Sequence, residues 1–438
     1  MKTLLTGARI IDPSQDLDGI RDLLIDEGRI AEIGQDLKPG GAGNSKMNVR
    51  VIDLKGLIVT PGLIDIHTHF RDPGFEYKET VETGSAAAAA GGFTAVACMA
   101  NTDPCNDNRA VTNYMIQKAK ACGLTRLYPV GAISIGLKGE KMAEYADMKA
   151  AGIVAISDDG RPVMNSRFMR MALEYARSLD LPVISHAEDT DLTAGGLMHE
   201  GKVSTELGLP GIPAIGEEVM IARDILLSAY TGAAVHIAHV STRGAVALLR
   251  NAKAGNIRVT AETAPHYFTL SDELLREFDT RLKVNPPLRS ADDVLAIKEG
   301  LRDGTIDAIA SDHAPHADTE KALEFEYALS GMIGLETSLA LSLRLVKEGC
   351  LTLSQLVSKM STNPAKILGL PLGTLRPGAI ADITVIDPDR HWNVDSQQFH
   401  SKSRNCPYEN WPMQGKAVMT FVGGEIKYNG SSLADHDC

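Results

Sequence analysis

The chain has 438 residues, 44% of them hydrophobic and 23% charged, and its 44 Lys and Arg against 56 Asp and Glu give a formal net charge of −12. This composition excludes a fibrous or intrinsically disordered chain. Negative charge without a long basic run argues against nucleic-acid and anionic-membrane partners, so we expect a small-molecule partner. The six cysteines form no CxxC pair and no apolar signal-peptide core is present, which predicts a cytoplasmic location.

The two ends of the chain have a residue pattern typical of β-strands, with apolar and polar residues alternating between turn residues. Strands are predicted at residues 4–11, 22–26 and 29–33, and again at 381–387, 418–422 and 425–428. We therefore expect a small composite β-sandwich module formed by both termini, from residues 1–60 and 372–438. The Gly-rich stretch 39–48 is expected to be a flexible loop.

Between these ends, eight short apolar runs alternate with stretches of helical length. The runs lie at residues 63–69, 93–99, 126–133, 153–157, 182–186, 234–239, 257–262 and 306–311. Helices are expected at residues 109–121, 166–179, 217–229, 244–254 and 291–301. Eight strand-helix units predict an α/β fold, a (β/α)8 TIM-type barrel over residues 61–371.

Polar residues gather where the predicted barrel strands end, which is where such barrels carry their active sites. They are His67 and His69, Asn101, Asp158 and Asp159, His186, His239, Glu262 and His266, and Asp312. Side chains alternate along a strand, so His67 and His69 face the same side and suit one divalent cation. His236 is expected to pack on the opposite face of its strand from His239.

Four histidines and two aspartates exceed what one four-coordinate zinc with an open position uses, so two metals are predicted. Such a pair needs a bridging carboxylate and holds a hydroxide, and from the residues alone Asp158 and Asp159 both remain candidates for the bridge. Asp312 is placed to bind a metal and to accept a proton. The charged run 320–326 is interpreted as a solvated loop or helix face, with a place at the border of the active-site entrance as the alternative.

The run from Pro61 to Gly74, PGLIDIHTHFRDPG, resembles the signature of the dihydroorotases of the amidohydrolase superfamily, with the bacterial type I enzymes closest in pattern. Further blocks follow in order: Met99-Ala-Asn-Thr, Ser157-Asp-Asp-Gly, His186-Ala-Glu-Asp, His239-Val-Ser-Thr, Asn285-Pro-Pro-Leu-Arg and Ser311-Asp-His-Ala-Pro-His. The resemblance implies a zinc-dependent enzyme that reversibly cyclises N-carbamoyl-L-aspartate to L-dihydroorotate in de novo pyrimidine synthesis.

The resemblance also implies a role for each site residue. His67 and His69 would bind the first of two Zn2+ ions, His186 and His239 the second, and Asp159 would bridge them together with a hydroxide. Asp312 would be both metal ligand and catalytic acid/base. The residues implied for the substrate are Arg71, Asn101 and His316 for its carboxylate, Asn285 for its ring, and His69 and Gly331. Many relatives have Pro-Phe-Gly where this chain has Leu329-Ser330-Gly331.

Two alternatives stay open at this point. A hydantoinase, dihydropyrimidinase or allantoinase shares barrel and metals, but its substrates lack the ring carboxylate that Arg71 and Asn101 suit. A non-catalytic homologue could instead support an aspartate transcarbamoylase.

Cobalt and manganese fit the same mixed ligands as zinc. A homodimer and association with aspartate transcarbamoylase are also expected.

Overall fold

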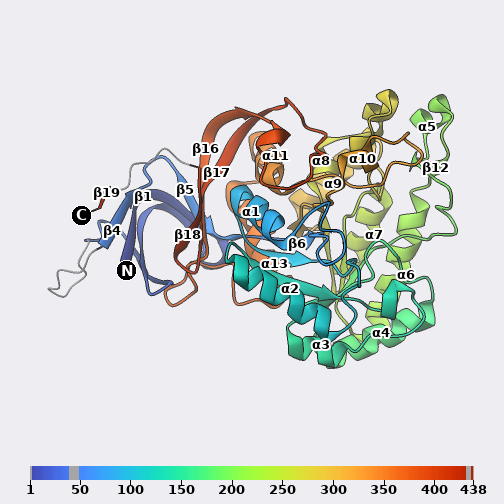
Figure 1. Cartoon of the computed structure of the whole chain (residues 1–438), viewed down its shortest axis with the longest axis horizontal. Coiled ribbons are helices and arrows are strands. Elements are labelled where there is room, and N and C mark those ends of the chain that lie inside the picture. The colour runs from blue at the N-terminus through green and yellow to red at the C-terminus, as the bar shows by residue number, and fades with distance from the viewer. Residues whose placement is uncertain (1, 39–48, 431–435, 438) are drawn as a thin grey trace.

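Eight parallel strands form the centre of the molecule in the computed structural model, which describes residues 2–38, 49–430 and 436–437 (Figure 1). In spatial order they run β15-β14-β13-β10-β9-β8-β7-β6. Their bounds are β6 (Leu63–Thr68), β7 (Phe93–Cys98), β8 (Arg126–Gly131), β9 (Ala155–Ile156), β10 (Val183–Ser185), β13 (Val235–Ile237), β14 (Val259–Thr263) and β15 (Ala308–Ile309). Each of the eight predicted apolar runs overlaps one of these strands, which confirms the predicted barrel.

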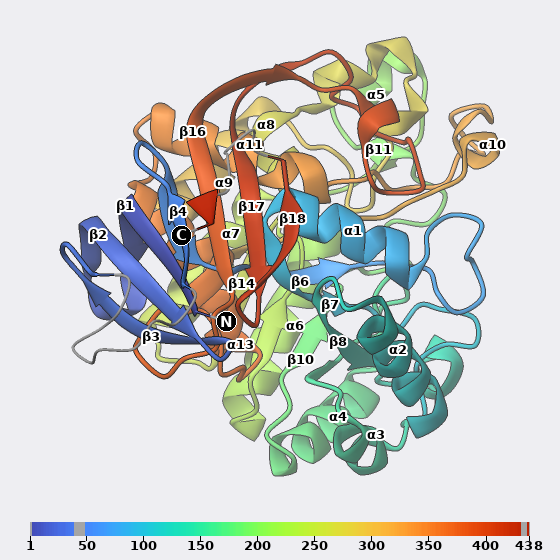
Figure 2. The same cartoon turned by 60° about the vertical axis from the view of Figure 1, so that its left-hand side comes forward.

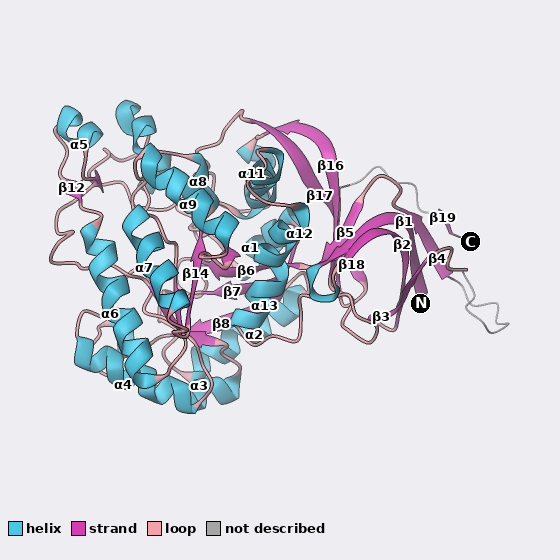
Figure 3. Ribbon diagram, turned by 180° about the vertical axis from the view of Figure 1, so that it is seen from behind, coloured by secondary structure: helices cyan, strands magenta, loops and turns pink. Residues whose placement is uncertain are grey.

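The helices surround these strands on the outside (Figure 3). The longer ones are α1 (Val81–Gly91), α2 (Arg109–Cys122), α3 (Tyr145–Ala151), α4 (Ser166–Ser178), α6 (Ile215–Thr231), α7 (Arg243–Ala254), α9 (Ala291–Asp303) and α11 (Leu335–Lys347). The shorter ones are α5 (Lys202–Leu207), α8 (Pro265–Thr269), α10 (Asp318–Lys321), α12 (Leu353–Val357) and α13 (Asn363–Ile367). All five predicted helices are present, and none of the helices in the described part of the chain combines the length and apolar character needed to cross a bilayer.

Helix α4 shows how the sequence produces this layer. Asn165 caps its amino terminus by accepting a hydrogen bond from the Phe168 backbone N–H. Its buried residues Phe168, Met169, Ala172, Leu173 and Ala176 recur at helical spacing. They form one apolar face, which joins the main hydrophobic core around the barrel.

Strands from both chain ends share one nine-stranded sheet, ordered β18-β17-β16-β5-β1-β2-β3, with β4 on β1 and β19 on β4 (Figure 2). Their bounds are β1 (Lys2–Asp12), β2 (Leu17–Asp26), β3 (Arg29–Gly34), β4 (Val49–Asp53), β5 (Ile58–Pro61), β16 (Ile383–Asn393), β17 (Pro412–Val422), β18 (Glu425–Asn429) and β19 (His436–Asp437). Strand β5 is parallel to β1 and antiparallel to β16. The β-rich module built from both ends is thus confirmed, its limits at residues 60 and 372 stay predictions, and the predicted loop at 39–48 lies outside the described residues.

The terminal sheet is joined to the barrel by buried polar contacts. The Thr384 hydroxyl on β16 accepts from the Leu63 N–H at 3.1 Å and donates to the Gly92 carbonyl at 2.6 Å. The Asp382 carboxylate accepts from Arg126 Nε at 2.7 Å. The Thr384 contacts fix the start of β6, the strand that carries His67, whereas the Asp382 contact lies at the start of β8.

The barrel closes between β6 and β15, at the two ends of the strand order. The His69 N–H donates to the His313 carbonyl at 2.9 Å. The buried Asp65 carboxylate accepts from the Ser311 N–H at 3.1 and 3.2 Å and from the His67 N–H at 3.1 Å. Burial raises the pKa of Asp65 to about 6. This seam brings the end of the last strand beside the two histidines of the first.

Candidate metal centre

A cavity of about 430 Å³ opens at the carboxyl ends of the barrel strands. It collects nearly all the predicted site residues: His69, Arg71, Asn101, Asp159, His186, His239, Asn285, Asp312, His316 and Gly331. His67 is the exception, because it is fully buried beneath the cavity. The fold therefore brings together side chains that lie up to about 260 residues apart in the sequence.

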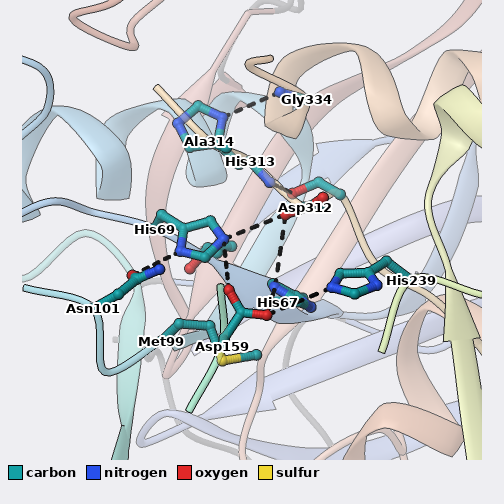
Figure 4. Close-up of polar contacts among 12 residues, drawn as sticks. His67, His69, Met99, Asn101, Asp159, His239, Asp312, His313, Ala314 and Gly334 are labelled. Atoms are coloured by element: carbon teal, nitrogen blue, oxygen red, sulfur yellow. Dashed lines mark hydrogen bonds and ion pairs between the residues drawn. The ribbon is translucent and has the colours of Figure 1, made fainter. Parts of the chain in front are cut away.

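Two aspartates face the two histidines of β6 (Figure 4). Asp312 Oδ1 lies 3.3 Å from His69 Nε2 and 3.6 Å from His67 Nε2. Asp159 Oδ1 lies 3.4 Å from His67 Nε2, and Asp159 Oδ2 lies 3.6 Å from His69 Nε2. Among the described residues, two groups have ligand atoms close enough together to hold a cation, namely His67 with His69 and Asp312, and His67 with Asp159 and His239.

The second predicted pair of histidines converges on the same aspartate. His186 Nδ1 and His239 Nε2 lie 3.4 and 3.5 Å from Asp159 Oδ1. These two nitrogens are 2.7 Å apart. Asp159 is thus the carboxylate that touches all four histidines.

Asp158, the other candidate for the bridge, points elsewhere. Its Oδ1 accepts from the backbone N–H groups of Ile133 and Ser134 at 2.8 and 3.0 Å, and its Oδ2 accepts from the Ser134 hydroxyl. Burial raises the pKa of Asp158 to about 6. Its hydrogen bonds hold the loop after β8, so the geometry favours Asp159 as the bridging residue.

The donor set fits a divalent cation. His67 Nε2 and Asp159 Oδ1 are buried without a hydrogen-bond partner within the described structure. Unpaired buried polar atoms are costly, and a cation among them would satisfy both. Imidazole nitrogen with carboxylate oxygen is a common ligand combination for zinc.

Oxygen acceptors behind the histidines orient the rings. His67 Nδ1 bonds to Glu262 Oε1 at 2.6 Å, His69 Nδ1 to Asn101 Oδ1 at 2.9 Å, and His186 Nε2 to Glu188 Oε2 at 3.1 Å. In a neutral ring, the nitrogen that donates to this oxygen carries the proton, and the other nitrogen is left free to bind a cation. The sequence analysis did not predict the contact of Glu188 with His186, although Glu188 follows His186 by two residues.

Glu262 connects two buried histidines. Its Oε2 lies 3.3 Å from His236 Nε2, and His236 Nδ1 bonds to the Thr260 hydroxyl at 2.8 Å. Burial would raise the pKa of Glu262, but the nearby His236 and the hydrogen bond from His67 outweigh it and lower the pKa to about 2. His236 therefore does more than pack on the opposite face, because it touches the residue that orients His67.

His266 is buried and lies outside the cavity lining.

The predicted substrate residues form another part of the same cavity. Arg71 Nε donates to the Pro315 carbonyl at 3.2 Å, and Asn285 Nδ2 donates to Glu188 Oε2 at 2.9 Å. His316 Nε2 bonds to the Ser330 carbonyl at 2.8 Å. Burial and the charge of Arg71 lower the pKa of His316 to about 3, so its ring is neutral. The Gly331 N–H donates to the Lys283 carbonyl at 2.8 Å.

Comparisons with known proteins found similar sequences and similar structures. Residues 56–245 match the model of the family described as Dihydro-orotase-like, and residues 245–428 match the Amidohydrolase family. A curated dihydroorotase of Syntrophus aciditrophicus (strain SB) is 59% identical over 428 residues, covering 98% of this chain and 99% of that protein. One from Geobacter metallireducens is 57% identical over 98% of this chain and 100% of its own length.

Among solved structures, the L-hydantoinase (dihydropyrimidinase) from Arthrobacter aurescens is similar to this chain with a TM-score of 0.86 and 26% identity. The match covers 99% of this chain and 97% of the hydantoinase. The dihydropyrimidinase from Brevibacillus agri NCHU1002, at 22% identity and a TM-score of 0.82, shows the shared fold.

Replacing Glu262 by glutamine should weaken metal binding about 10- to 100-fold, because the neutral amide makes a weaker hydrogen bond to His67 Nδ1. The measurement is a titration of metal-free protein with Zn2+ against a chromogenic chelator. Asp382→Asn is the matched control, since it neutralises another buried carboxylate far from the centre. Equal zinc affinity of Glu262→Gln and the unsubstituted protein would rule out the orienting role.

Proposed function

Because the chain belongs to the dihydroorotase family of amidohydrolases, we propose that its barrel cavity interconverts N-carbamoyl-L-aspartate and L-dihydroorotate with the help of two zinc ions. The observation that carries this proposal is one cavity in which four histidines and two aspartates lie beside Arg71. The reaction, the opening and closing of a cyclic amide in pyrimidine biosynthesis, is that of the dihydroorotases.

We assign the metal ligands from the contacts. His67, His69 and Asp312 would hold one ion, His186 and His239 the other, and Asp159 would bridge them, since it approaches all four rings. When bound, such ions activate a water molecule at neutral pH and polarise the amide carbonyl. The protein keeps the metal-binding nitrogens of the histidines free of protons. Glu262, Asn101 and Glu188 do this by accepting a hydrogen bond from the other nitrogen of each ring.

Asp312 is the proposed acid and base. Burial would raise its pKa, but the neighbouring His67 and His69 lower the pKa below its ordinary value, so the carboxylate is ionised and can accept a proton. In the hydrolytic direction it takes the proton of the attacking water and delivers it to the departing ring nitrogen. In the cyclising direction the same carboxylate takes a proton from the carbamoyl nitrogen and returns it to the leaving oxygen.

Substrate recognition is assigned to the other part of the cavity. The Arg71 guanidinium is bound through Nε to the protein, so its two terminal nitrogens are available to a carboxylate. Asn101 uses its oxygen on His69, which leaves its amide N–H groups for the same carboxylate. We place Asn285 at the ring, and His69, His316 and Gly331 around the bound substrate.

The hydantoinase alternative shares the fold, as the similarity to the Arthrobacter enzyme shows, but rings without a carboxylate would leave Arg71 unpaired in the cavity. The scaffold alternative is disfavoured because the predicted metal ligands all meet at one place. A homodimer and association with aspartate transcarbamoylase stay predictions, which analytical ultracentrifugation with and without that partner would test.

The proposed activity predicts that zinc-reconstituted protein opens L-dihydroorotate and leaves dihydrouracil, hydantoin and allantoin unchanged. Protein stripped with a chelator should be inactive and regain turnover on addition of metal. Absorbance of the ring amide follows all four substrates in one assay. Turnover of the uncharged rings alone would favour the hydantoinase alternative, and no turnover with metal bound would favour a scaffold.

Asp312→Asn should lower kcat by about 10²- to 10⁴-fold, the usual contribution of a general acid or base, because the amide cannot accept the proton. The fold and the second metal should persist, and circular dichroism with metal analysis would check both. A kcat within about threefold of the unsubstituted enzyme, well short of that loss, would contradict the proton-transfer role.

Arg71→Ala should raise KM for L-dihydroorotate about 10- to 100-fold, because it removes charge-assisted hydrogen bonds worth about 1.5–3 kcal/mol. Metal content should not change. Arg109→Ala, which removes an arginine paired with Asp147 on the surface, serves as the control. Unchanged saturation by substrate in Arg71→Ala would remove Arg71 from the carboxylate site.

A further inference from the structure

We propose that Lys321, at the end of α10, is a positioning residue for the substrate: its buried ammonium holds residues 329–331 against Lys283, where they form part of the cavity wall. The inference rests on the proposed function, since it concerns how that substrate is held. The sequence indicated a solvated charged run at 320–326. Lys321 is instead only 7% exposed.

The ammonium of Lys321 has a full set of acceptors. Its Nζ donates to the carbonyls of Leu329 at 2.7 Å, Gly331 at 3.0 Å and Lys283 at 3.5 Å. An ammonium group has three N–H donors, so each donor has one carbonyl. The Lys321 side chain thereby joins the two ends of the segment 321–331 to each other and to Lys283, two residues before Asn285.

A second buried lysine strengthens the same segment from the other side. Lys283, also 7% exposed, donates through Nζ to the carbonyls of Phe325 at 2.6 Å and Glu326 at 2.9 Å. Its own carbonyl accepts from the Gly331 N–H at 2.8 Å. The path of residues 325–331 is thus set by two ammonium groups and not by an apolar core alone.

This path reaches the substrate site through His316. The Ser330 carbonyl bonds to His316 Nε2 at 2.8 Å. A Cβ atom on Gly331 would lie 2.9 Å from both His316 Nε2 and the Ala314 carbonyl, so the segment packs against these residues without spare room. A displacement of residues 329–331 would therefore move His316 or change its hydrogen bond.

The arrangement is sensitive to the loss of either partner. All three acceptors of Lys321 are backbone carbonyls. A buried cation without its hydrogen bonds is strongly unfavourable, and so are buried carbonyls without donors. Removing the ammonium should release the Leu329 carbonyl and loosen the segment.

The test compares Lys321→Met with Lys359→Met. Lys359 is a matched control: it is 6% exposed, lies on the π-helix η5 (Ser358–Thr362), and its Nζ donates to the Ile306 carbonyl at 2.6 Å, before β15 and so at the opposite end of the barrel. Lys321→Met should raise KM for L-dihydroorotate about tenfold or more, with kcat within about threefold, because the lost contact holds the substrate and the transition state equally. Lys359→Met should leave KM unchanged.

Two further readouts separate positioning from general damage. Hydrogen exchange of residues 322–331 should become faster in Lys321→Met and not in Lys359→Met, with equal metal content in both. Lys321→Gln, which keeps two N–H donors, should restore part of the lost affinity. An unchanged KM with faster exchange would overturn the proposal, as would an equal rise of KM in both methionine variants. If the unsubstituted enzyme does not turn over dihydroorotate, the proposed function fails, whereas the exchange comparison still decides whether Lys321 holds the segment.

Discussion

The candidate metal centre depends on the hydrogen bonds of one buried carboxylate, that of Asp65. It lies on the first barrel strand and accepts hydrogen bonds from Ser311, at the end of the last strand, and from His67. Parallel strands at the two ends of a sheet meet only if the barrel closes, and this side chain spans the seam. Because Asp312 follows Ser311 directly, the closing contact and the approach of Asp312 to His67 and His69 are the same event. The candidate metal centre therefore depends on barrel closure as well as on the local pair His67 and His69.

The metal and substrate regions are also coupled through shared side chains. Asn101 bonds to His69 with its oxygen and keeps its amide protons for the cavity. Glu188 accepts from His186, Asn285 and the Thr193 hydroxyl. A change in either residue would thus disturb a proposed metal ligand and a proposed substrate contact together. Comparing metal affinity with KM would separate the two contributions.

Much of this architecture follows from sequence patterns. Apolar runs of strand length separated by amphipathic helices predict the barrel, and its known geometry then places the residues after each run at one rim. The residues alone could not separate Asp158 from Asp159, and only the family resemblance favoured Asp159, because successive residues at a strand end point to different sides and the loop decides which side is the cavity. Lys321 was misjudged for a similar reason. Glu324 and Glu326 of the same run are exposed. Only the folded chain brings together the carbonyls of Leu329, Gly331 and Lys283, which allow a lysine to be buried.

The shared terminal sheet has a consequence for the order in which the chain can fold. Strand β5 pairs with β1 on one side almost as soon as it is made, but its other neighbour, β16, is more than 300 residues further along. During synthesis the whole barrel can be assembled while this edge of β5 still has no partner. Exposed strand edges recruit other strands, so the interval before β16 emerges from the ribosome is the period in which a nascent chain is most open to aggregation and to chaperones.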